Sequence, residues 1–107
     1  MIIMIIQINA DHNLKIHAAF RDKLKDLLAE ELDRFSEQTT RLEMHLSDVN
    51  GNKDGLNDKR CLIEARVQGR EPIVATDLAD TYEQAVSGAI EKLKAALESK
   101  LSKLKSF

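Results

Sequence analysis

The sequence predicts an α+β two-layer sandwich, in which two helices cover one face of a four-stranded mixed sheet. Four short segments are β-branched or alternate between apolar and polar residues, and two longer segments repeat apolar residues every three or four positions. Their order is β-α-β-β-β-α, so we expect the first two strands to be parallel and the last three to form an antiparallel meander. Both apolar helix stripes need a sheet face to cover, and one shared face gives two layers.

Length and composition are those of one soluble domain, which we expect to span residues 1–107. The chain is 43% hydrophobic and 32% charged, and it has no run of about 18 apolar residues that could cross a membrane. The apolar opening "MIIMIIQIN" lacks the basic start and the cleavage site of a signal peptide. Cys61 is the only cysteine, which excludes an intrachain disulfide, and we expect a cytoplasmic protein.

The first strand is predicted at Ile2–Ile8, which is apolar enough to be covered on one face and largely shielded on the other. "NADHN" follows, where Asp11 or Asn13 could cap the first helical amides. The first helix is predicted at Leu14–Phe35 from apolar residues that share one face. These residues are Phe20, Leu24, Leu27, Leu28 and Phe35. An acidic row on the opposite face consists of Asp22, Asp26, Glu30, Asp33 and Glu37.

Two alternating segments and one short segment predict the remaining strands. "RLEMHLSD" at 41–48 is the second strand, "DKRCLIEARV" at 58–67 is the third, and Ile73–Asp77 after the turn "QGREP" is the fourth. The polar stretch "DVNGNKDGLND" at 48–58 predicts a mobile hairpin loop. The side chains expected to face the core are Leu42, Met44 and Leu46 on the second strand, and Cys61, Ile63, Ala65 and Val67 on the third.

The third strand carries charge on its other face. Arg60 and Arg66 alternate there with Leu62 and Glu64. We expect the arginines to pair with Glu64 and, across the hairpin, with Glu43, in cross-strand contacts worth roughly 0.2–1 kcal/mol each. This predicts an open, solvated sheet face.

The second helix is predicted to begin near Asp80, because "DTYE" resembles a capping box with Glu83 three residues after the cap. Gly88 lies inside this helix, where it costs about 1 kcal/mol relative to alanine. We expect it to allow close packing on the sheet. The apolar stripe of the helix consists of Tyr82, Val86, Ala89, Ile90, Leu93, Leu97, Leu101 and Leu104.

No arrangement of reactive side chains predicts an enzyme. His12 and His17 do not share a helix face, and neither they nor His45 join a cysteine in a metal-ligand pattern. Cys61 falls on an apolar strand face, where thiols are usually inert. "NGNKDG" lacks the spacing of a phosphate-binding loop. We therefore expect no catalysis, no metal, no cofactor and no small-molecule substrate.

The charge distribution points to binding instead. The net charge of −2 argues against a strongly basic nucleic-acid binder. However, residues 1–58 carry 7 Lys/Arg against 11 Asp/Glu, whereas residues 59–107 carry 9 against 7. A basic excess therefore lies in the third strand and the second helix, where it could mark an interaction surface.

The lysines of the second helix flank its apolar stripe. Lys92 and Lys103 share one edge, Lys94 and Lys105 share the other, and Lys100 lies nearer the stripe. One interpretation is that their stems cover the margin of the core while the ammonium groups stay in water. The other is that they contact phosphates and add salt-dependent affinity for nucleic acid.

Several motifs together resemble the ribosome hibernation factors, the family of hibernation-promoting factor and ribosome-associated inhibitor A, also called sigma-54 modulation proteins. The resemblance covers nearly the whole chain, from "AFRDKLKDLL" in the first helix and "HLSD" in the second strand to "GREPIVATDLADTYEQAVSGAIEKLKAAL". The last stretch is the most specific. Its matching residues are Gly69, Ala75, Asp80, Ala85–Val86 and Glu91–Lys92–Leu93.

This resemblance implies a fold similar to double-stranded RNA-binding domains with an added strand. It also implies a factor that binds ribosomal RNA of the small ribosomal subunit, in the channel for mRNA and tRNA. Occupying that channel inhibits translation and promotes ribosome hibernation in stationary phase or stress. Arg21 and Lys92 match family positions that face ribosomal RNA. The candidate set is completed by nearby residues, Lys25, Lys94, Lys100 and Lys103.

The sequence departs from the family pattern at two places. Glu83 stands where the family usually has a tyrosine, with Tyr82 one position earlier. Leu27 and Glu30 lie near first-helix positions where the family usually carries lysine or arginine, and the exposed face of this helix holds the acidic row. The alternative function is a protein-interaction module, or a homodimer formed through the open sheet face. Its support is the acidic first helix and an apolar residue, Leu62, on the outer face of the sheet.

Overall fold

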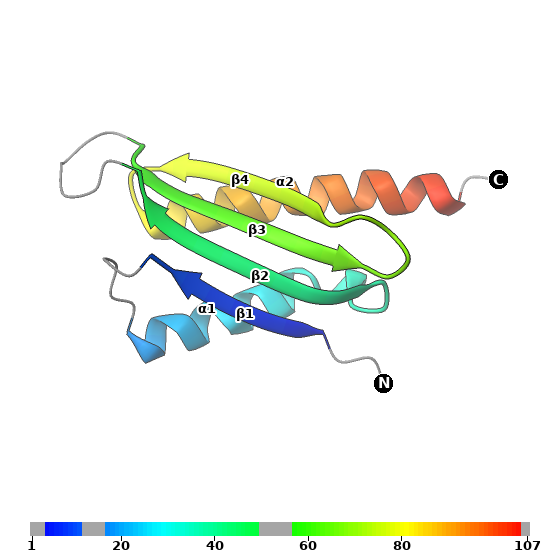
Figure 1. The fold of residues 1–107 in the computed structure, drawn as a ribbon, viewed down its shortest axis with the longest axis horizontal. Helices are drawn as coiled ribbons and strands as arrows, with labels where there is room; N and C mark the ends of the chain where they lie inside the picture. Colours follow the sequence, from blue (N-terminus) through cyan, green and yellow to red (C-terminus); the bar gives the residue numbers. More distant parts are fainter. Residues whose placement is uncertain (1–3, 12–16, 50–56, 106–107) are drawn as a thin grey trace.

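The computed structural model describes residues 4–11, 17–49 and 57–105, with side chains as far as Leu101. It confirms the predicted order of elements (Figure 1). The elements are β1 (Ile5–Ala10), α1 (Ala18–Glu31), the 3-10 helix η1 (Asp33–Phe35), β2 (Thr39–Asp48), β3 (Lys59–Val67), β4 (Ile73–Ala79) and α2 (Tyr82–Lys105).

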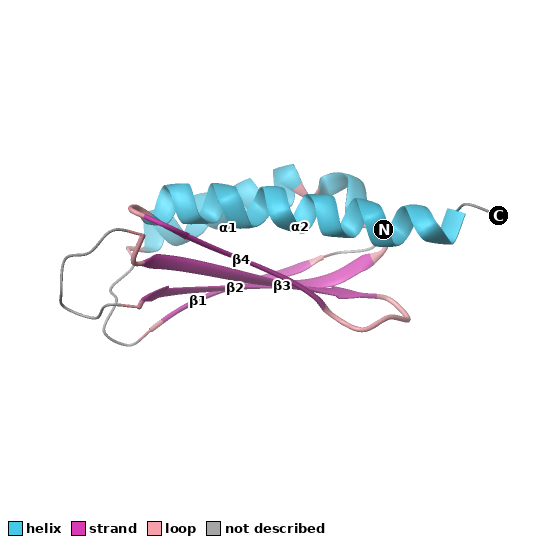
Figure 2. Ribbon diagram, turned by 90° about the horizontal axis from the view of Figure 1, so that it is seen from above, coloured by secondary structure: helices cyan, strands magenta, loops and turns pink. Residues whose placement is uncertain are grey.

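The sheet has the strand order β1-β2-β3-β4, with β1 parallel to β2 and the other pairs antiparallel, as the sequence predicts. The register places Ile8 opposite Met44, Met44 opposite Ile63, and Ile63 opposite Ala75. One row of apolar side chains therefore crosses the whole sheet. Both helices cover the face that this row occupies, which confirms the α+β two-layer class (Figure 2).

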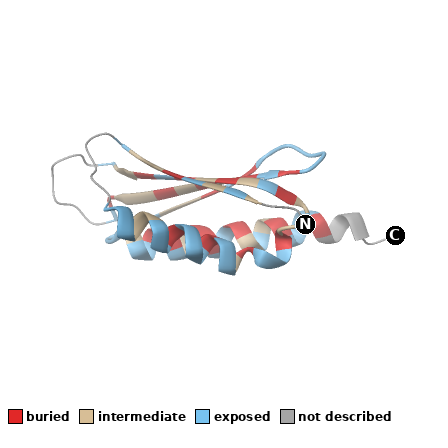
Figure 3. Cartoon of the chain, turned by 90° about the horizontal axis from the view of Figure 1, so that it is seen from below, coloured by how far each residue is buried: buried red, intermediate tan, exposed pale blue. Residues whose placement is uncertain are grey.

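The core lies between the two layers, and the opposite sheet face is mostly exposed or half-buried (Figure 3). The predicted inner residues of β2 and β3 are buried, and so is the described part of the α2 stripe apart from the half-buried Tyr82. Leu27 was expected in the core but is 36% exposed. Seen down the helix axis, Leu27 points about 80° away from the direction midway between the buried Leu24 and Leu28. Leu32, which was not predicted, is fully buried instead.

The first helix is shorter than predicted. It ends at Glu31, and Leu32 leaves the helical conformation with φ −110° and ψ 16° before η1 begins. The break allows both Leu32 and Phe35 to enter the core. The residue before the helix is His17, which makes no side-chain cap, so Asp11 is not its cap. The predicted start at Leu14 and the alternative cap Asn13 lie outside the described residues, as does 50–56 of the predicted loop.

The edge strands also differ from the prediction. β1 runs to Ala10, and the Asp11 amide still donates to the Leu46 carbonyl at 3.1 Å, so the ladder with β2 continues past Ile8. Ile2 lies outside the described residues. The outer face of β1 is not shielded, because no layer covers that side, and Ile5 is 55% exposed. β4 continues two residues beyond Asp77, to Ala79.

The N-cap of α2 lies one residue later than predicted. The Gln84 amide donates to Thr81 Oγ1 at 3.1 Å, so Thr81 is the N-cap of the "TYEQ" turn. Asp80, the predicted cap, instead accepts a hydrogen bond from the Asn57 amide at 2.7 Å. The Asp80 side chain therefore joins the β2–β3 connection to the start of α2.

Candidate nucleic-acid interface

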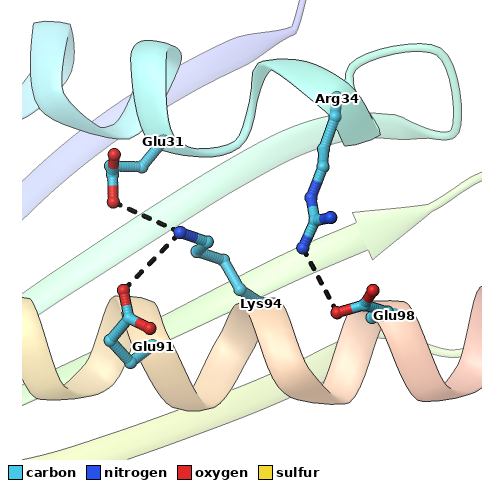
Figure 4. A network of polar contacts seen from close by, with 5 residues as sticks. All are labelled: Glu31, Arg34, Glu91, Lys94 and Glu98. Atoms are coloured by element: carbon cyan, nitrogen blue, oxygen red, sulfur yellow. Dashed lines mark hydrogen bonds and ion pairs between the residues drawn. The ribbon is translucent and has the colours of Figure 1, made fainter.

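The seam between α1 and α2 is bridged by ion pairs (Figure 4). Lys94 Nζ lies 3.4 Å from Glu31 Oε1 and 3.5 Å from Glu91 Oε1, and its side chain is only 24% exposed. Arg34 Nη2 lies 3.3 Å from Glu98 Oε2, and both of these side chains are more than half exposed. Among the described residues, these ion pairs combine two cations with three carboxylates, so their local charge does not favour an anionic ligand.

Arg21 and Lys25 are the α1 members of the predicted RNA-binding set. Arg21 is half-buried, and its guanidinium donates to the backbone carbonyl of Ile8, which ties α1 to β1. Lys25 is exposed, but Asp22 of the acidic row lies three residues before it and shares its side of the helix. The acidic row is exposed at every predicted position.

Lys92 lies on the other edge of α2, toward β4. Its ammonium group is 2.7 Å from Asp77 Oδ1 and donates to the Thr76 carbonyl at 3.3 Å. The Lys92 side chain is still 59% exposed. Asp77 sits below Gly88, where an added Cβ would come within 1.9 Å of Asp77 Oδ2. This confirms that Gly88 allows close packing between α2 and the sheet.

Lys100 lies near the β3–β4 turn, where it lines a surface hollow with Arg70, Glu71 and Ile73. The side chain of Lys103 lies outside the described part of the chain. Three described members of the predicted set reach three different elements: Arg21 faces β1, Lys92 faces β4, and Lys94 faces α1. Their role in binding RNA stays a prediction.

Sequence reasoning missed two cations that the fold brings to this side of the molecule. Arg34 reaches Glu98 across 64 residues of sequence, and Arg70 approaches Lys100 from a turn. No local pattern marks either contact, because each depends on how two distant elements pack.

The outer sheet face carries paired charges and scattered apolar side chains. Arg66 Nε is 3.4 Å from Glu64 Oε1, which confirms one predicted pair, whereas Glu43 is paired with Arg41 at 3.2 Å. The hydrogen bond from Arg41 holds the pKa of Glu43 below its ordinary value, with smaller contributions from nearby positive charges. Exposed apolar residues on this face are Ile5, Val74 and Leu78.

A second polar cluster lies where β2 and β3 meet the start of α2. Lys59 Nζ is 3.0 Å from Asp48 Oδ2 and 2.9 Å from Asp58 Oδ1, and the hydrogen bonds that it donates to Asp58 and Asp48 raise the Lys59 pKa. The same ammonium group lies 6.0 Å from the centre of the Tyr82 ring. In the described ranges, no three His, Cys, Asp or Glu side chains are grouped as a metal site would require.

None of the helices in the described ranges is both long enough and apolar enough to span a membrane.

Comparisons with known proteins agree on the fold. The model of the sigma 54 modulation protein / S30EA ribosomal protein family matches residues 6–105. The crystal structure of the Thermus thermophilus Protein Y N-terminal domain has a TM-score of 0.69 and 22% identity, covering 91% of this chain and 98% of that one. A ribosomal subunit interface protein from Coxiella burnetii has a TM-score of 0.67 and 18% identity, covering 98% and 100%. No curated protein sequence matches the chain.

Proposed function

The chain belongs to the sigma 54 modulation protein / S30EA ribosomal protein family, and we propose that it is a ribosome-associated factor that inhibits translation. It binds ribosomal RNA of the small subunit in the channel for mRNA and tRNA, and it promotes ribosome hibernation in stationary phase or stress. The observation that carries this proposal is the family match, which spans residues 6–105 and thus both helices and the whole sheet.

The proposed RNA contacts come from the helices. Lys25 and Lys100 have exposed side chains, and exposed ammonium groups bind phosphates by releasing condensed counterions. Arg21, Lys92 and Lys94 have intramolecular partners, so a phosphate would have to compete with a carbonyl or with carboxylates for them. Lys103 completes the proposed set. A domain held in the channel blocks mRNA and tRNA sterically, so inhibition requires no catalysis.

The proposal is tested by sedimenting purified ribosomes and separated subunits with the protein at low and high salt. We expect the protein to pellet with 70S ribosomes or small subunits at low salt and to be released as salt rises, because phosphate contacts are salt-dependent. We also expect it to slow a cell-free translation reaction. Protein that stays in the supernatant at low salt would contradict the proposal.

The site is tested with the charge-reversal variant K92E/K94E/K100E. We expect it to lose co-sedimentation while remaining folded by circular dichroism. Arg60→Glu is the matched control, because Arg60 lies on the sheet face opposite the helices. If the triple variant still pellets like the wild type, the proposed helix surface is the wrong one.

A second candidate function is a homodimer or protein-interaction module that uses the outer sheet face. The observation that favours it is the exposure of Val74 and Leu78 on the edge strand β4, at 50% and 47%. Sedimentation equilibrium would detect such a dimer, and the variant V74K/L78K should then be monomeric. A wild-type protein that is monomeric in this measurement excludes the homodimer.

A further inference from the structure

The hollow between the β3–β4 turn and α2 brings together two cations that are distant in sequence. It is lined by Arg70 and Glu71 from the turn, by Ile73 at the start of β4, and by Lys100 from α2. Ile73 is only 6% exposed and is the apolar residue of this described lining. Within the described part of the chain, the Arg70 and Lys100 side chains have no hydrogen-bond or ion-pair partner.

The turn that carries Arg70 has a defined conformation. Gly69 has a φ of +74°, which suits glycine at the third position of a type II turn, and the Arg70 amide donates to the Val67 carbonyl at 3.1 Å. The Gln68 amide donates to the Gln38 carbonyl at 2.8 Å, which ties the turn to the segment before β2. The backbone of Arg70 is therefore held in place before any ligand binds.

Lys100 reaches the hollow because of its position on α2. It follows Leu97 by three residues and Leu93 by seven, so it projects from the sheet-facing side of the helix. The C-terminal part of α2 extends beyond the β3–β4 turn (Figure 1). Lys100 is thus exposed at the end of a buried stripe.

The charge balance of this hollow differs from that of the α1–α2 seam. The described ion pairs of the seam contain one more carboxylate than cations, and both of these cations, Lys94 and Arg34, are already paired. Among the described residues that line the hollow, there is one more cation than carboxylates. A phosphate that binds in the hollow displaces no ion pair of Arg70 or Lys100, whereas one that binds Lys94 must displace Glu31 and Glu91.

From these observations we propose that Arg70 and Lys100 jointly bind a backbone phosphate of RNA in this hollow, and that this contact anchors the RNA. The inference rests on the proposed function and adds Arg70 to its site. The Arg70 guanidinium supplies paired donors for phosphate oxygens, and Lys100 supplies a point charge on the other side. Glu71 opposes the anion and limits the affinity.

The test measures the affinity of a fluorescein-labelled single-stranded RNA oligonucleotide, and of purified small subunits, over a series of salt concentrations. We expect R70Q and K100Q each to weaken RNA binding about tenfold at low salt, and each to reduce the slope of log K against log salt by about 0.7. Glu71→Gln should strengthen binding, because it removes the opposing charge. Arg60→Gln on the outer sheet face is the matched arginine control and should bind like the wild type.

The outcomes separate this inference from the proposed function. If the wild type binds the oligonucleotide but not small subunits, the ribosomal function is wrong. The phosphate site in the hollow is then tested by whether R70Q and K100Q bind the oligonucleotide more weakly than the wild type. If the wild type binds both and these variants match it, the anchoring phosphate is not in the hollow. A wild type that binds neither RNA nor subunits overturns both proposals.

Discussion

Lys92 Nζ lies 2.7 Å from Asp77 Oδ1, and this ion pair connects α2 to the edge strand β4. The lysine belongs to the proposed RNA-binding set, yet its partner is a carboxylate of the same chain. Asp77 therefore acts as an internal competitor for any phosphate that approaches Lys92.

Replacing Asp77 with Asn should strengthen RNA binding, because Lys92 then keeps its charge without an anionic partner. The loss of stability should be below about 1 kcal/mol, since the lysine is mostly exposed and water screens the pair. Fluorescence anisotropy with labelled RNA and urea unfolding would measure the two effects. Glu30→Gln on the exposed face of α1 is the control with the same change of charge. Equal effects of both substitutions would show that only net charge matters.

Replacing Gly88 with Ala should destabilise the protein, although alanine is the better helix former by about 1 kcal/mol. The new Cβ would lie 1.9 Å from Asp77 Oδ2 and 2.6 Å from Asp77 Cγ, so the carboxylate must rotate away and leave Lys92. Overpacking of this kind costs about 1–3 kcal/mol. Thermal or urea unfolding would measure the change.

The double variant D77A/G88A tests this explanation. Removing the carboxylate makes room for the new methyl group, so the double variant should be more stable than G88A alone. A G88A protein at least as stable as the wild type would contradict the close packing of Gly88 on Asp77.

The Cys61 thiol should be unreactive in the folded protein. It is fully buried, and burial, reinforced by the Asp77 carboxylate, raises its pKa to about 12. At pH 8 we expect no reaction with the thiol reagent DTNB in native buffer and one equivalent in urea. Rapid reaction of the native protein would show that β3 opens readily.

The same raised pKa predicts a loss of stability at high pH. An unfolded thiol ionises near pH 8.5, whereas the folded thiol stays protonated until about pH 12, so the unfolded state gains stability between these values. The stabilising contribution of the protonated Cys61 thiol is fully present below the pKa of the unfolded thiol, and it is lost as pH rises through this window. Cys61→Ala lacks this contribution, so its unfolding free energy should fall less between pH 9 and about 12. Parallel pH profiles for the two proteins would contradict the prediction.

Replacing Arg41 with Gln should raise the pKa of Glu43 toward its ordinary value, because the hydrogen bond from Arg41 is the main cause of its depression. In the wild type, this pairing contributes stability above the unfolded carboxyl pKa, and the contribution is lost as pH falls through the folded one. An NMR titration of the Glu43 carboxyl carbon would follow the change. Arg60→Gln should leave the titration unchanged, and a shift in that control would mean that longer-range charge dominates.

Much of the fold could be predicted because its signals are local. Alternation along β3 correctly assigned Cys61, Ile63, Ala65 and Val67 to the core, since neighbouring side chains of a strand point to opposite faces. The spacing of apolar residues by three and four positions likewise assigned one face of α2 to the core. The ends of the helices and strands depend on tertiary packing as well. The first helix ends at Glu31 because the chain turns there to place Leu32 and Phe35 in the core, and helix propensity does not predict that turn.

By itself, the sequence determined the order of the elements, which faces are apolar, the acidic row of α1 and the family to which the chain is similar. Only the tertiary structure decided which charges are paired. Lys94 pairs with Glu31 across 63 residues, whereas Arg70 and Lys100 line one hollow without a described ion-pair partner. The physical reason is that periodicity acts within one element, whereas the partner of a charged side chain depends on how separate helices and turns pack together.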